Sequence, residues 1–258
     1  MFFYLDYLFM NFRKAYLISF PKCGRTWLRL MIGSYLKHHF NLAKYEDTQL
    51  KKISSSAFGI PKLKVSHDGD PHKSNIEEIS SNKKSYKNSS IIFLVRDPRD
   101  IIVSLYYHEL KRTQNFDGTI HEFIHQTQSP LDKIIKFYNI WGNNKNYVKN
   151  FLLMKYEDLN TNPFDSMKNL LYFLNINKID SKLLQNIIAH YSFNNMKKME
   201  ENYAYNEFWI QPKDKEDPHS FKTREGKIGN YVNYLNNEDI TFVNNKLKSK
   251  LNFFYSFD

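Results

Sequence analysis

Four short apolar runs of the sequence are each followed by a side chain that could do chemistry. The side chains are Lys22, His67, Arg96 and Tyr156. Lysine and arginine attract phosphate and sulfate groups, and histidine, with an unperturbed pKa of about 6.5, can accept a proton at physiological pH. These residue types suit the binding of an anion and the movement of a proton beside it.

The first of these side chains lies in PKCGRTW, residues 21–27, which is expected to bind phosphate. A helix is predicted to begin near Thr26, so the unpaired N–H groups of its first turn face the loop. Gly24 lets the backbone approach a ligand closely, and Lys22 adds a compact charge. The loop is not a Walker A motif, GxxxxGK[ST], because its lysine precedes its only glycine. A nucleoside triphosphate with magnesium is therefore disfavoured; an ordinary turn with a surface lysine is the alternative.

The segment LVRDPRDIIVSLYYHEL places Arg96 at the end of an apolar run and Ser104 in the helix that follows. Pro98 suits the first turn of a helix, and Asp97 suits the N-cap before it. Ser104 lies roughly 9 Å along that helix from Pro98. Arg96 could bind an anion, and a structural ion pair with a carboxylate such as Asp100 is the alternative.

The apolar runs predict the strands that must position these side chains. AYLISF, SSIIFLVRD and NFLLMKYEDL are each followed by a helical pattern and are typical of buried parallel strands. A fourth candidate strand lies within residues 59–70. Alternating strands and helices predict an α/β fold, a doubly wound parallel sheet with flanking helices and right-handed crossovers. Because ligands bind outside the carboxyl ends of such strands, the four side chains are expected on one rim.

The remaining sequence is predicted to complete a single domain over residues 1–258. Residues 112–150 show helical and loop-like patterns, whereas residues 200–229 are polar and irregular, so we interpret the latter as a mobile segment over a site. Two polar stretches, KKISSSA and SSNKKSYKNSS, are expected to be surface loops. No stretch rich in proline, glycine or serine divides the chain, which favours one domain.

Composition limits the class of protein and its partners. The chain is 41% hydrophobic and 16% aromatic, enough for a packed core, and its net charge of +10 favours anionic partners. Its only cysteine, Cys23, excludes an intramolecular disulfide and suits a reducing, cytoplasmic location. The apolar residues 1–14 are interrupted by Asp6 and fall short of the about 20 that span a membrane. We expect there a helix or tail that supports the fold, and neither a transmembrane span nor a signal peptide.

Five segments, taken together, resemble the sulfotransferases that use 3′-phosphoadenosine 5′-phosphosulfate (PAPS) as donor. PKCGRTW is similar to the family's 5′-phosphosulfate loop, commonly written PKSGTTW, and Arg96 with Ser104 eight residues later is similar to its 3′-phosphate motif. Three further segments resemble the family's later sequence blocks in the same order: YEDL at 156–159, YSFNNMKK at 191–198 and REGKIGNYVNYL at 224–235. The likeness covers about residues 15–235 and implies the P-loop NTPase-like sulfotransferase fold.

The resemblance implies a role for each matching residue. The residues implied to hold the 5′-phosphosulfate are Lys22, Cys23, Gly24, Arg25 and Thr26. Those implied to bind the 3′-phosphate are Arg96, Ser104, Arg224, Glu225 and the backbone near Gly226. Those implied to contact the adenine or the rest of the nucleotide are Trp27, Phe193 and Tyr156.

The same resemblance implies the reaction. His67 would be the general base for in-line attack by a hydroxyl, or less readily an amine, and Lys22 would neutralise charge as the sulfuryl group leaves. The product would be adenosine 3′,5′-bisphosphate, with no metal required. The acceptor could be a small molecule, a glycan or a lipid. Tyr203, Tyr205, Phe208 and Trp209 could line its pocket or pack the mobile segment onto the core.

Several positions depart from the family pattern. Cys23 replaces a serine, and Arg25 replaces a threonine and could add a forked donor to the phosphosulfate. Val65 stands two residues before the histidine, where the family often has lysine, and Lys64 is expected on the opposite face of the strand. Glu225 replaces a basic residue, which would loosen the grip on the 3′-phosphate. The C-terminal residues lack the dimerisation signature of the animal cytosolic enzymes, so no oligomer is inferred.

Two other functions stay open on the sequence. A nucleotide or small-molecule kinase on a P-loop fold would need a Walker lysine and a magnesium site, and neither is apparent. A basic nucleic-acid-binding module would explain the positive charge, but the basic residues are scattered and no RNA-binding signature is present. We therefore expect no nucleic-acid partner.

Overall fold

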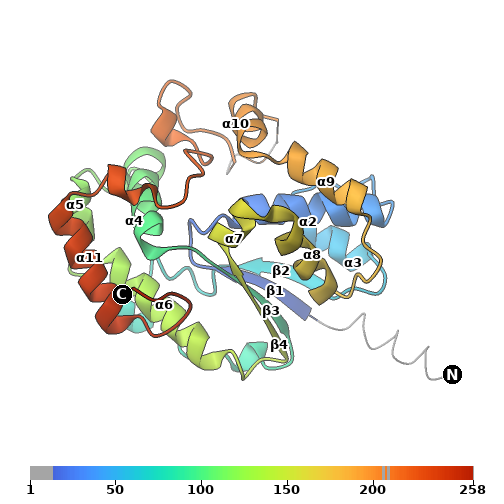
Figure 1. The fold of residues 1–258 in the computed structure, drawn as a ribbon, viewed down its shortest axis with the longest axis horizontal. Coiled ribbons are helices and arrows are strands. Elements are labelled where there is room, and N and C mark those ends of the chain that lie inside the picture. The colour runs from blue at the N-terminus through green and yellow to red at the C-terminus, as the bar shows by residue number, and fades with distance from the viewer. Residues whose placement is uncertain (1–13, 205–206, 208–209, 258) are drawn as a thin grey trace.

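The computed structural model describes residues 14–204, 207 and 210–257, and contains one parallel sheet in this part of the chain (Figure 1). Its strands are β1 (Lys14–Ser19), β2 (Lys62–Ser66), β3 (Ser90–Val95) and β4 (Asn150–Lys155), in the spatial order β2-β1-β3-β4. Leu17 of β1 is in register with Val65 of β2 and with Ile92 of β3. β2, β3 and β4 lie within the predicted runs, and β1 begins one residue earlier, at Lys14.

Helices cover both faces of the sheet, which confirms the doubly wound α/β fold (Figure 1). On one side pack α2 (Arg25–His39), α3 (Leu50–Ser56), α8 (Pro163–Phe173) and α9 (Ser181–His190). On the other side pack α4 (Pro98–Tyr107), α5 (Ile120–Ile124), α6 (Pro130–Asn144) and α11 (Asn237–Lys250). Two further helices are α7 (Tyr156–Thr161), directly after β4, and α10 (Phe193–Glu201). The shorter turns are η1 (Ile76–Glu78), η2 (Lys84–Tyr86), the π-helix η3 (His108–Thr113), η4 (Pro218–Ser220) and η5 (Asn230–Asn233).

The strand order creates the place for a ligand. Strands β1 and β3 are neighbours, yet α2 follows β1 on one side of the sheet and α4 follows β3 on the other (Figure 1). The chain therefore diverges between two adjacent carboxyl ends, and such a switch point leaves a crevice. The expected N-cap sharpens this end of α4, because the Asp97 carboxylate accepts a hydrogen bond from Arg99 N and Pro98 occupies the first helical turn.

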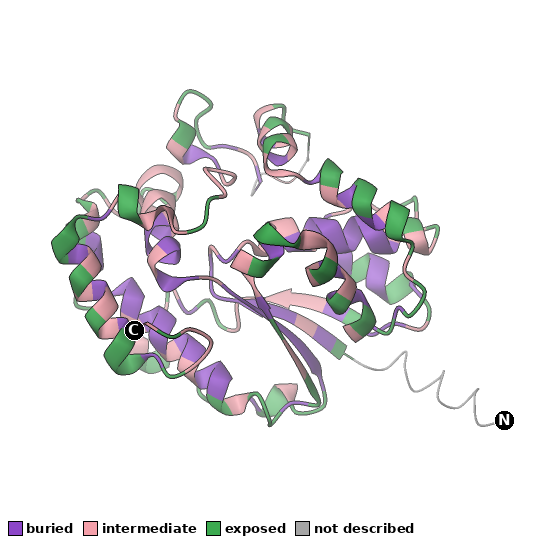
Figure 2. Ribbon diagram, viewed as in Figure 1, coloured by how far each residue is buried: buried purple, intermediate pink, exposed green. Residues whose placement is uncertain are grey.

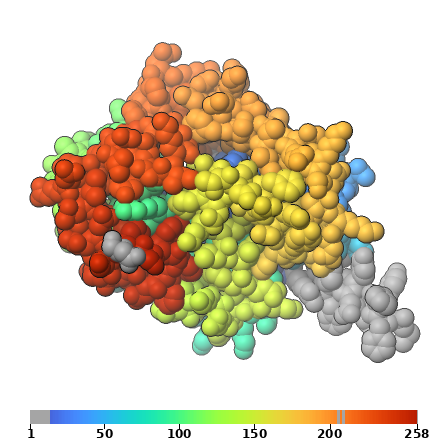
Figure 3. Space-filling view, in the orientation of Figure 1, coloured from blue at the N-terminus to red at the C-terminus, as the bar shows by residue number. Residues whose placement is uncertain are grey.

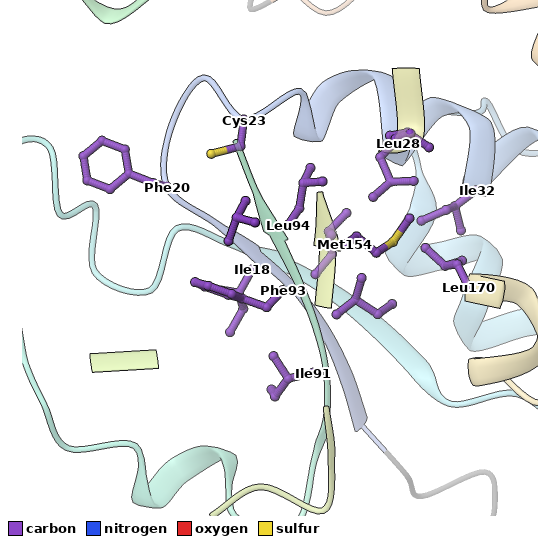
Figure 4. Packing of buried hydrophobic residues seen from close by; sticks show 14 of the residues in the cluster. Ile18, Phe20, Cys23, Leu28, Ile32, Ile91, Phe93, Leu94, Met154 and Leu170 are labelled. Atoms are coloured by element: carbon purple, nitrogen blue, oxygen red, sulfur yellow. The ribbon is translucent and has the colours of Figure 1, made fainter. Parts of the chain in front are cut away.

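The core lies on both faces of the central strands, as Figure 2 shows by the buried residues of β1 and β3. Phe93 has no exposed surface and packs against Phe137 and Trp141 of α6. Leu28 of α2 and Leu170 of α8 are equally buried and lie on the other side of β3 (Figure 4). Strand β4 differs from the expected buried strand, since Leu153 is 38% exposed. As an edge strand, β4 has a neighbour on one side only, so its apolar run is partly uncovered.

One sequence expectation about loops was wrong. KKISSSA forms most of α3 rather than a surface loop, because Leu50 and Ile53, three residues apart, bury one face of the helix against the rest of the fold. SSNKKSYKNSS is irregular apart from η2, as expected, although it contains the buried Lys83, whose ammonium lies 2.6 Å from an Asp68 carboxylate oxygen. Tertiary burial therefore overrode the polar composition in the first stretch.

The N-terminal residues 1–14 were expected to form a helix or tail that supports the fold. Residues 1–13 of this segment lie outside the described residues. Across the part of the chain that the structure describes, none of the helices combines the length and apolar character that crossing a bilayer requires.

Candidate functional site

A cavity of about 760 Å³ lies at the switch point, outside the carboxyl ends of the strands. Figure 3 shows a hollow in the surface there, between α7 in yellow and the α10 region in orange. Blue atoms, which belong to the first part of the described chain, are visible at the bottom of the hollow. The four strand-end residues, Lys22, His67, Arg96 and Tyr156, all line this cavity. The other predicted site residues that line it are Gly24, Arg25, Thr26, Trp27, Ser104, Phe193, Arg224, Glu225 and Gly226.

The loop between β1 and α2 is shaped to hold an anion. Lys22 and Gly24 both have left-handed backbone conformations, with φ of 73° and 86°, and α2 begins directly afterwards at Arg25. Gly24 is the N-cap and has no side chain to accept from the N–H groups of the first turn. Those groups and the positive end of the helix dipole are therefore available to a ligand in the cavity.

Cys23 is the one predicted site residue whose side chain does not face the cavity. Its side chain has no exposed surface and belongs to the hydrophobic core (Figure 4), where Sγ lies 3.5 Å from the Tyr138 hydroxyl. Burial raises the pKa of the thiol to about 12. The implied role of Cys23 can therefore be filled only by its backbone, and the change from serine to cysteine leaves the cavity wall unaltered.

Gly24 also determines where Tyr156 packs. A Cβ atom added at Gly24 would lie 2.6 Å from Cδ2 of the Tyr156 ring, and the left-handed φ disfavours any L side chain.

Gly24→Ala is therefore expected to lower the thermal melting temperature more than Gly59→Ala, each measured against the parent protein. Gly59 has nearly the same φ, 85°, with nothing within 4 Å of an added Cβ, so its substitution reports backbone strain alone, about 1–2 kcal/mol. Equal losses in the two variants would contradict the packing of Tyr156 on Gly24.

Arg96, directly after β3, and Ser104 of α4 form a second region of the cavity wall. The Arg96 guanidinium lies 4.3 Å from the centre of the Tyr156 ring and donates to the carbonyls of Lys22, at 3.3 Å, and Lys227, at 3.0 Å. It also lies 3.6 Å from the Asp100 carboxylate. The ion pair named as the alternative role is thus present, and Arg96 lines the cavity as well.

Residues 224–231 close this side of the cavity. The Arg224 guanidinium lies 4.5 Å from the Tyr107 ring and donates to the Tyr234 hydroxyl at 2.8 Å. The Glu225 carboxylate accepts short hydrogen bonds from Tyr234 and Asn230, so both of its oxygens already have partners. Glu225 therefore supports the segment that carries Arg224.

Aromatic side chains line the cavity between the two charged regions. Trp27 donates its indole N–H to the Tyr191 carbonyl at 2.7 Å, and its ring centre lies 6.2 Å from that of Tyr156. Phe193 packs against Gly226, where an added Cβ would lie 2.3 Å from the ring. The Tyr156 hydroxyl donates to the Gly226 carbonyl at 3.1 Å, so the aromatic wall and the 224–231 segment support each other.

His67 is held in one tautomer. Its Nδ1 lies 2.9 Å from the Ser19 carbonyl, which can only accept, so Nδ1 carries the proton. The Arg25 guanidinium donates a short hydrogen bond to Nε2. Burial, and then the Arg25 charge, lower the pKa of His67 to about 3. His67 is therefore neutral at physiological pH, with its lone pair occupied by Arg25.

The structure adds cavity residues that the sequence reasoning missed: Arg29, His72, His108 and Lys222. Lys222 stands two residues before Arg224 in KTREGK, and that proximity could have revealed it. Burial, then the charge of Arg112, lower the pKa of Lys222 to about 8. Burial, then the charge of Lys222, lower the pKa of Lys22 well below its usual value. Lys64 does not line the cavity, and its ammonium lies 5.8 Å from the centre of the Tyr16 ring.

Several contacts hold the irregular segment between α10 and η5 over the cavity. The Glu200 carboxylate, only 1% exposed, accepts hydrogen bonds from the backbone N–H groups of Lys222 and Thr223. Arg112 donates to the carbonyls of Gln211 and Ser220. Ile210 and residues 222–227 of this segment line the cavity, and the expectation of a mobile segment over a site stays a prediction.

The comparisons with known proteins agree with one another. The sulfotransferase domain model matches residues 13–254. Flavonol 3-sulfotransferase of Flaveria bidentis is 24% identical over 92% of this chain and 81% of its own length. Sulfotransferase 1B1 of Mus musculus is 25% identical over 84% of this chain and 75% of its own length.

Solved structures show the same fold. Mouse sulfotransferase SULT7A1, solved in complex with PAP, superposes with a TM-score of 0.60 at 20% identity, over 93% of this chain and 86% of its own. Retinol dehydratase, solved with androsterone and PAP, superposes with a TM-score of 0.61 at 14% identity, over 97% of this chain and 85% of its own. Because the family model spans nearly the whole chain, the protein belongs to the sulfotransferase family and is an enzyme of that class.

Proposed function

We propose that the protein transfers a sulfuryl group from PAPS to a hydroxyl acceptor, with His67 as general base. The main support is a neutral histidine beside an anion-binding loop in a cavity that has a second basic region at Arg96. The solved relatives contain PAP, the product of such a donor. An amine acceptor would fit the same chemistry less readily, since an ammonium has no lone pair to attack with.

The charge of the cavity wall supports a polyanionic donor. Seven lining residues are basic and two are acidic. A donor with a 3′-phosphate and a 5′-phosphosulfate carries about four negative charges. After burial, the charge of Lys222 is the largest cause that lowers the pKa of Lys22, and a bound anion beside the two ammonium groups would relieve that repulsion.

The donor would bind in an extended pose across the two basic regions. We assign its 5′-phosphosulfate to Lys22, Arg25, Thr26 and the loop N–H groups, and its 3′-phosphate to Arg96, Ser104 and Arg224. Trp27 and Phe193 would contact the adenine. Lys22 would then stabilise the negative charge that develops on the departing phosphate.

The acidic residues of the wall support transfer without a metal ion. Asp100 and Glu225 are the two carboxylates that line the cavity among the described residues. Asp100 accepts from the backbone N–H groups of Gly229 and Tyr231, and Glu225 accepts from Tyr234 and Asn230. Both carboxylates are thus engaged by donors of the protein itself, which disfavours their use as magnesium ligands and with it the kinase alternative.

His67 needs Arg25 to move before it can act. In the structure the Arg25 guanidinium occupies Nε2, the only ring nitrogen with a lone pair. We infer that the sulfonate of the donor draws Arg25 away from His67, because a charge-assisted pair is stronger than a bond to neutral imidazole. Nε2 would then accept the proton of the attacking hydroxyl.

An Arg25→Thr variant tests this coupling through the pH dependence of kcat/KM for the donor. The neutral form of His67 is the active one, and the Arg25 charge lowers its pKa. Removing that charge raises the pKa, so the acid limb of the variant is expected at higher pH than that of the parent protein. Both proteins experience the same titration of the donor, which cancels in the comparison. Coincident acid limbs would contradict the contact.

Ligand-induced thermal stabilisation tests the donor class. Adenosine 3′,5′-bisphosphate without magnesium is expected to raise the melting temperature, and adenosine 5′-monophosphate, which lacks the 3′-phosphate, to raise it less. Stabilisation by ATP with magnesium alone would instead support the kinase.

The acceptor is proposed as a small molecule with a hydroxyl group. Ile210 and Met196 add apolar surface to the cavity wall, and the retinol dehydratase structure contains androsterone. Of the four aromatic residues suggested for the acceptor pocket, Tyr203 is 44% exposed and contacts Lys215, and the other three lie outside the described residues. A donor-coupled screen of phenols, glycans and lipid alcohols distinguishes the classes. A cytoplasmic location also stays a proposal, consistent with a single buried thiol.

A further inference from the structure

Three side chains that commonly ligate metals converge on the outer side of the fold, outside the cavity wall. They are His121 of α5, His125 at the C-cap of that helix, and Asp239 in the first turn of α11. His121 Nδ1 lies 2.7 Å and His125 Nε2 lies 3.3 Å from the same Asp239 oxygen, Oδ1. When one potential ligand atom is taken from each residue, the three atoms all lie within 4.8 Å of one another.

Local structure fixes this convergence. Thr119 and Glu122 form a capping box that starts α5, and residues 121 and 125, four apart, then lie on one face of the helix. Asn236 caps α11 by accepting from Asp239 N, which orients the first turn of that helix. The His121 and His125 ring centres are 4.4 Å apart, and the Phe242 ring packs 4.2 Å from that of His125.

We propose that these three residues bind a zinc ion. Imidazole nitrogens and a carboxylate oxygen are preferred zinc ligands, at about 2.0–2.2 Å from the metal. Tetrahedral ligand atoms at such distances lie about 3.3 Å apart, which the His125–Asp239 separation already matches. The His121–Asp239 pair would open slightly once the metal replaces the ring proton between them.

Burial and exposure complete the site. The Asp239 side chain is 1% exposed, so its charge is removed from water and gains from a cationic partner. His121 and His125 are 48% and 32% exposed, which leaves solvent access for a water molecule as fourth ligand. The ion would link α5 to α11 through His121 and Asp239, which are 118 residues apart in the chain, and so stabilise the fold at a distance from the proposed reaction.

The test is zinc titration of the full chain in competition with a chromophoric chelator, together with melting temperatures. The parent protein is expected to bind one equivalent, to gain roughly 5 °C or more at saturating zinc, and to give a tetrahedral visible band with Co²⁺. A His121→Gln/His125→Gln variant should lose affinity by more than the roughly 10–100-fold that loss of an outer partner costs. It should also lose the thermal gain.

A His38→Gln/His190→Gln variant is the matched control, since both histidines are exposed and lie on α2 and α9. It is expected to retain the zinc response of the parent. Asp239→Asn provides a second ligand variant whose size is unchanged, and circular dichroism confirms that each variant is folded. Equal zinc affinity in the parent and in folded ligand variants, or no stoichiometric binding, would show that the cluster is held by hydrogen bonds alone.

Discussion

Replacement of His67 with alanine is expected to lower kcat by about 10²-fold or more while leaving donor affinity nearly unchanged. His67 is the neutral imidazole of the cavity that is fixed by a backbone carbonyl, Ser19, and it presents Nε2 to the site. Its removal eliminates the proposed proton acceptor without removing a cation that would hold the donor. The measurements are steady-state turnover and the Kd of adenosine 3′,5′-bisphosphate.

His72→Ala is the informative control for this experiment. The His72 ring centre lies 6.1 Å from that of His67, and His72 also lines the cavity. A general loss of packing in this region would affect both variants, whereas loss of the base would affect His67→Ala alone. Turnover near the parent value in a folded His67→Ala protein would remove this residue from the mechanism.

The Arg96→Ala substitution is expected to weaken binding of adenosine 3′,5′-bisphosphate by roughly 10–100-fold, which corresponds to the loss of charge-assisted hydrogen bonds worth about 1.5–3 kcal/mol. The affinity for adenosine 5′-monophosphate should change far less, because that nucleotide lacks the phosphate assigned to Arg96. Isothermal titration with both nucleotides separates recognition of the 3′-phosphate from general damage to the cavity.

Arg99→Ala controls for the structural contacts of Arg96. Arg99 lies on the same helix terminus, pairs with Asp97 at 2.6 Å and stacks 4.4 Å from the Tyr231 ring, yet it does not line the cavity. It should cost stability without discriminating between the two nucleotides. If Arg96→Ala weakened both nucleotides equally, the assignment of the 3′-phosphate would be wrong.

The sequence predicted most of what positions the site. The runs before Lys22, His67, Arg96 and Tyr156 form parallel strands, and parallel strands bring their carboxyl ends to one edge, so the rim followed from pattern alone. The N-cap at Asp97 also followed, because its chemistry is local.

What the sequence left undetermined depends on the direction of side chains. The left-handed residues on each side of Cys23 turn its thiol into the core, and no periodicity encodes that turn. The contact between Arg25 and His67 joins residues 42 positions apart. Lys222 enters the cavity from an irregular segment, and Asp239 meets His121 only because α11 packs beside α5. Each of these requires the tertiary fold.

The Asp100 carboxylate has a consequence for the thermodynamics of donor recognition. Its oxygens accept from Gly229 N at 2.8 Å and Tyr231 N at 3.1 Å, and they lie on the helix that also carries Ser104. These contacts tie the backbone of residues 229–231 to α4 as part of the fold. The conformational entropy of this backbone is therefore lost when the chain folds and not when the donor binds. As a result, a larger share of the free energy of the phosphate contacts contributes to binding affinity.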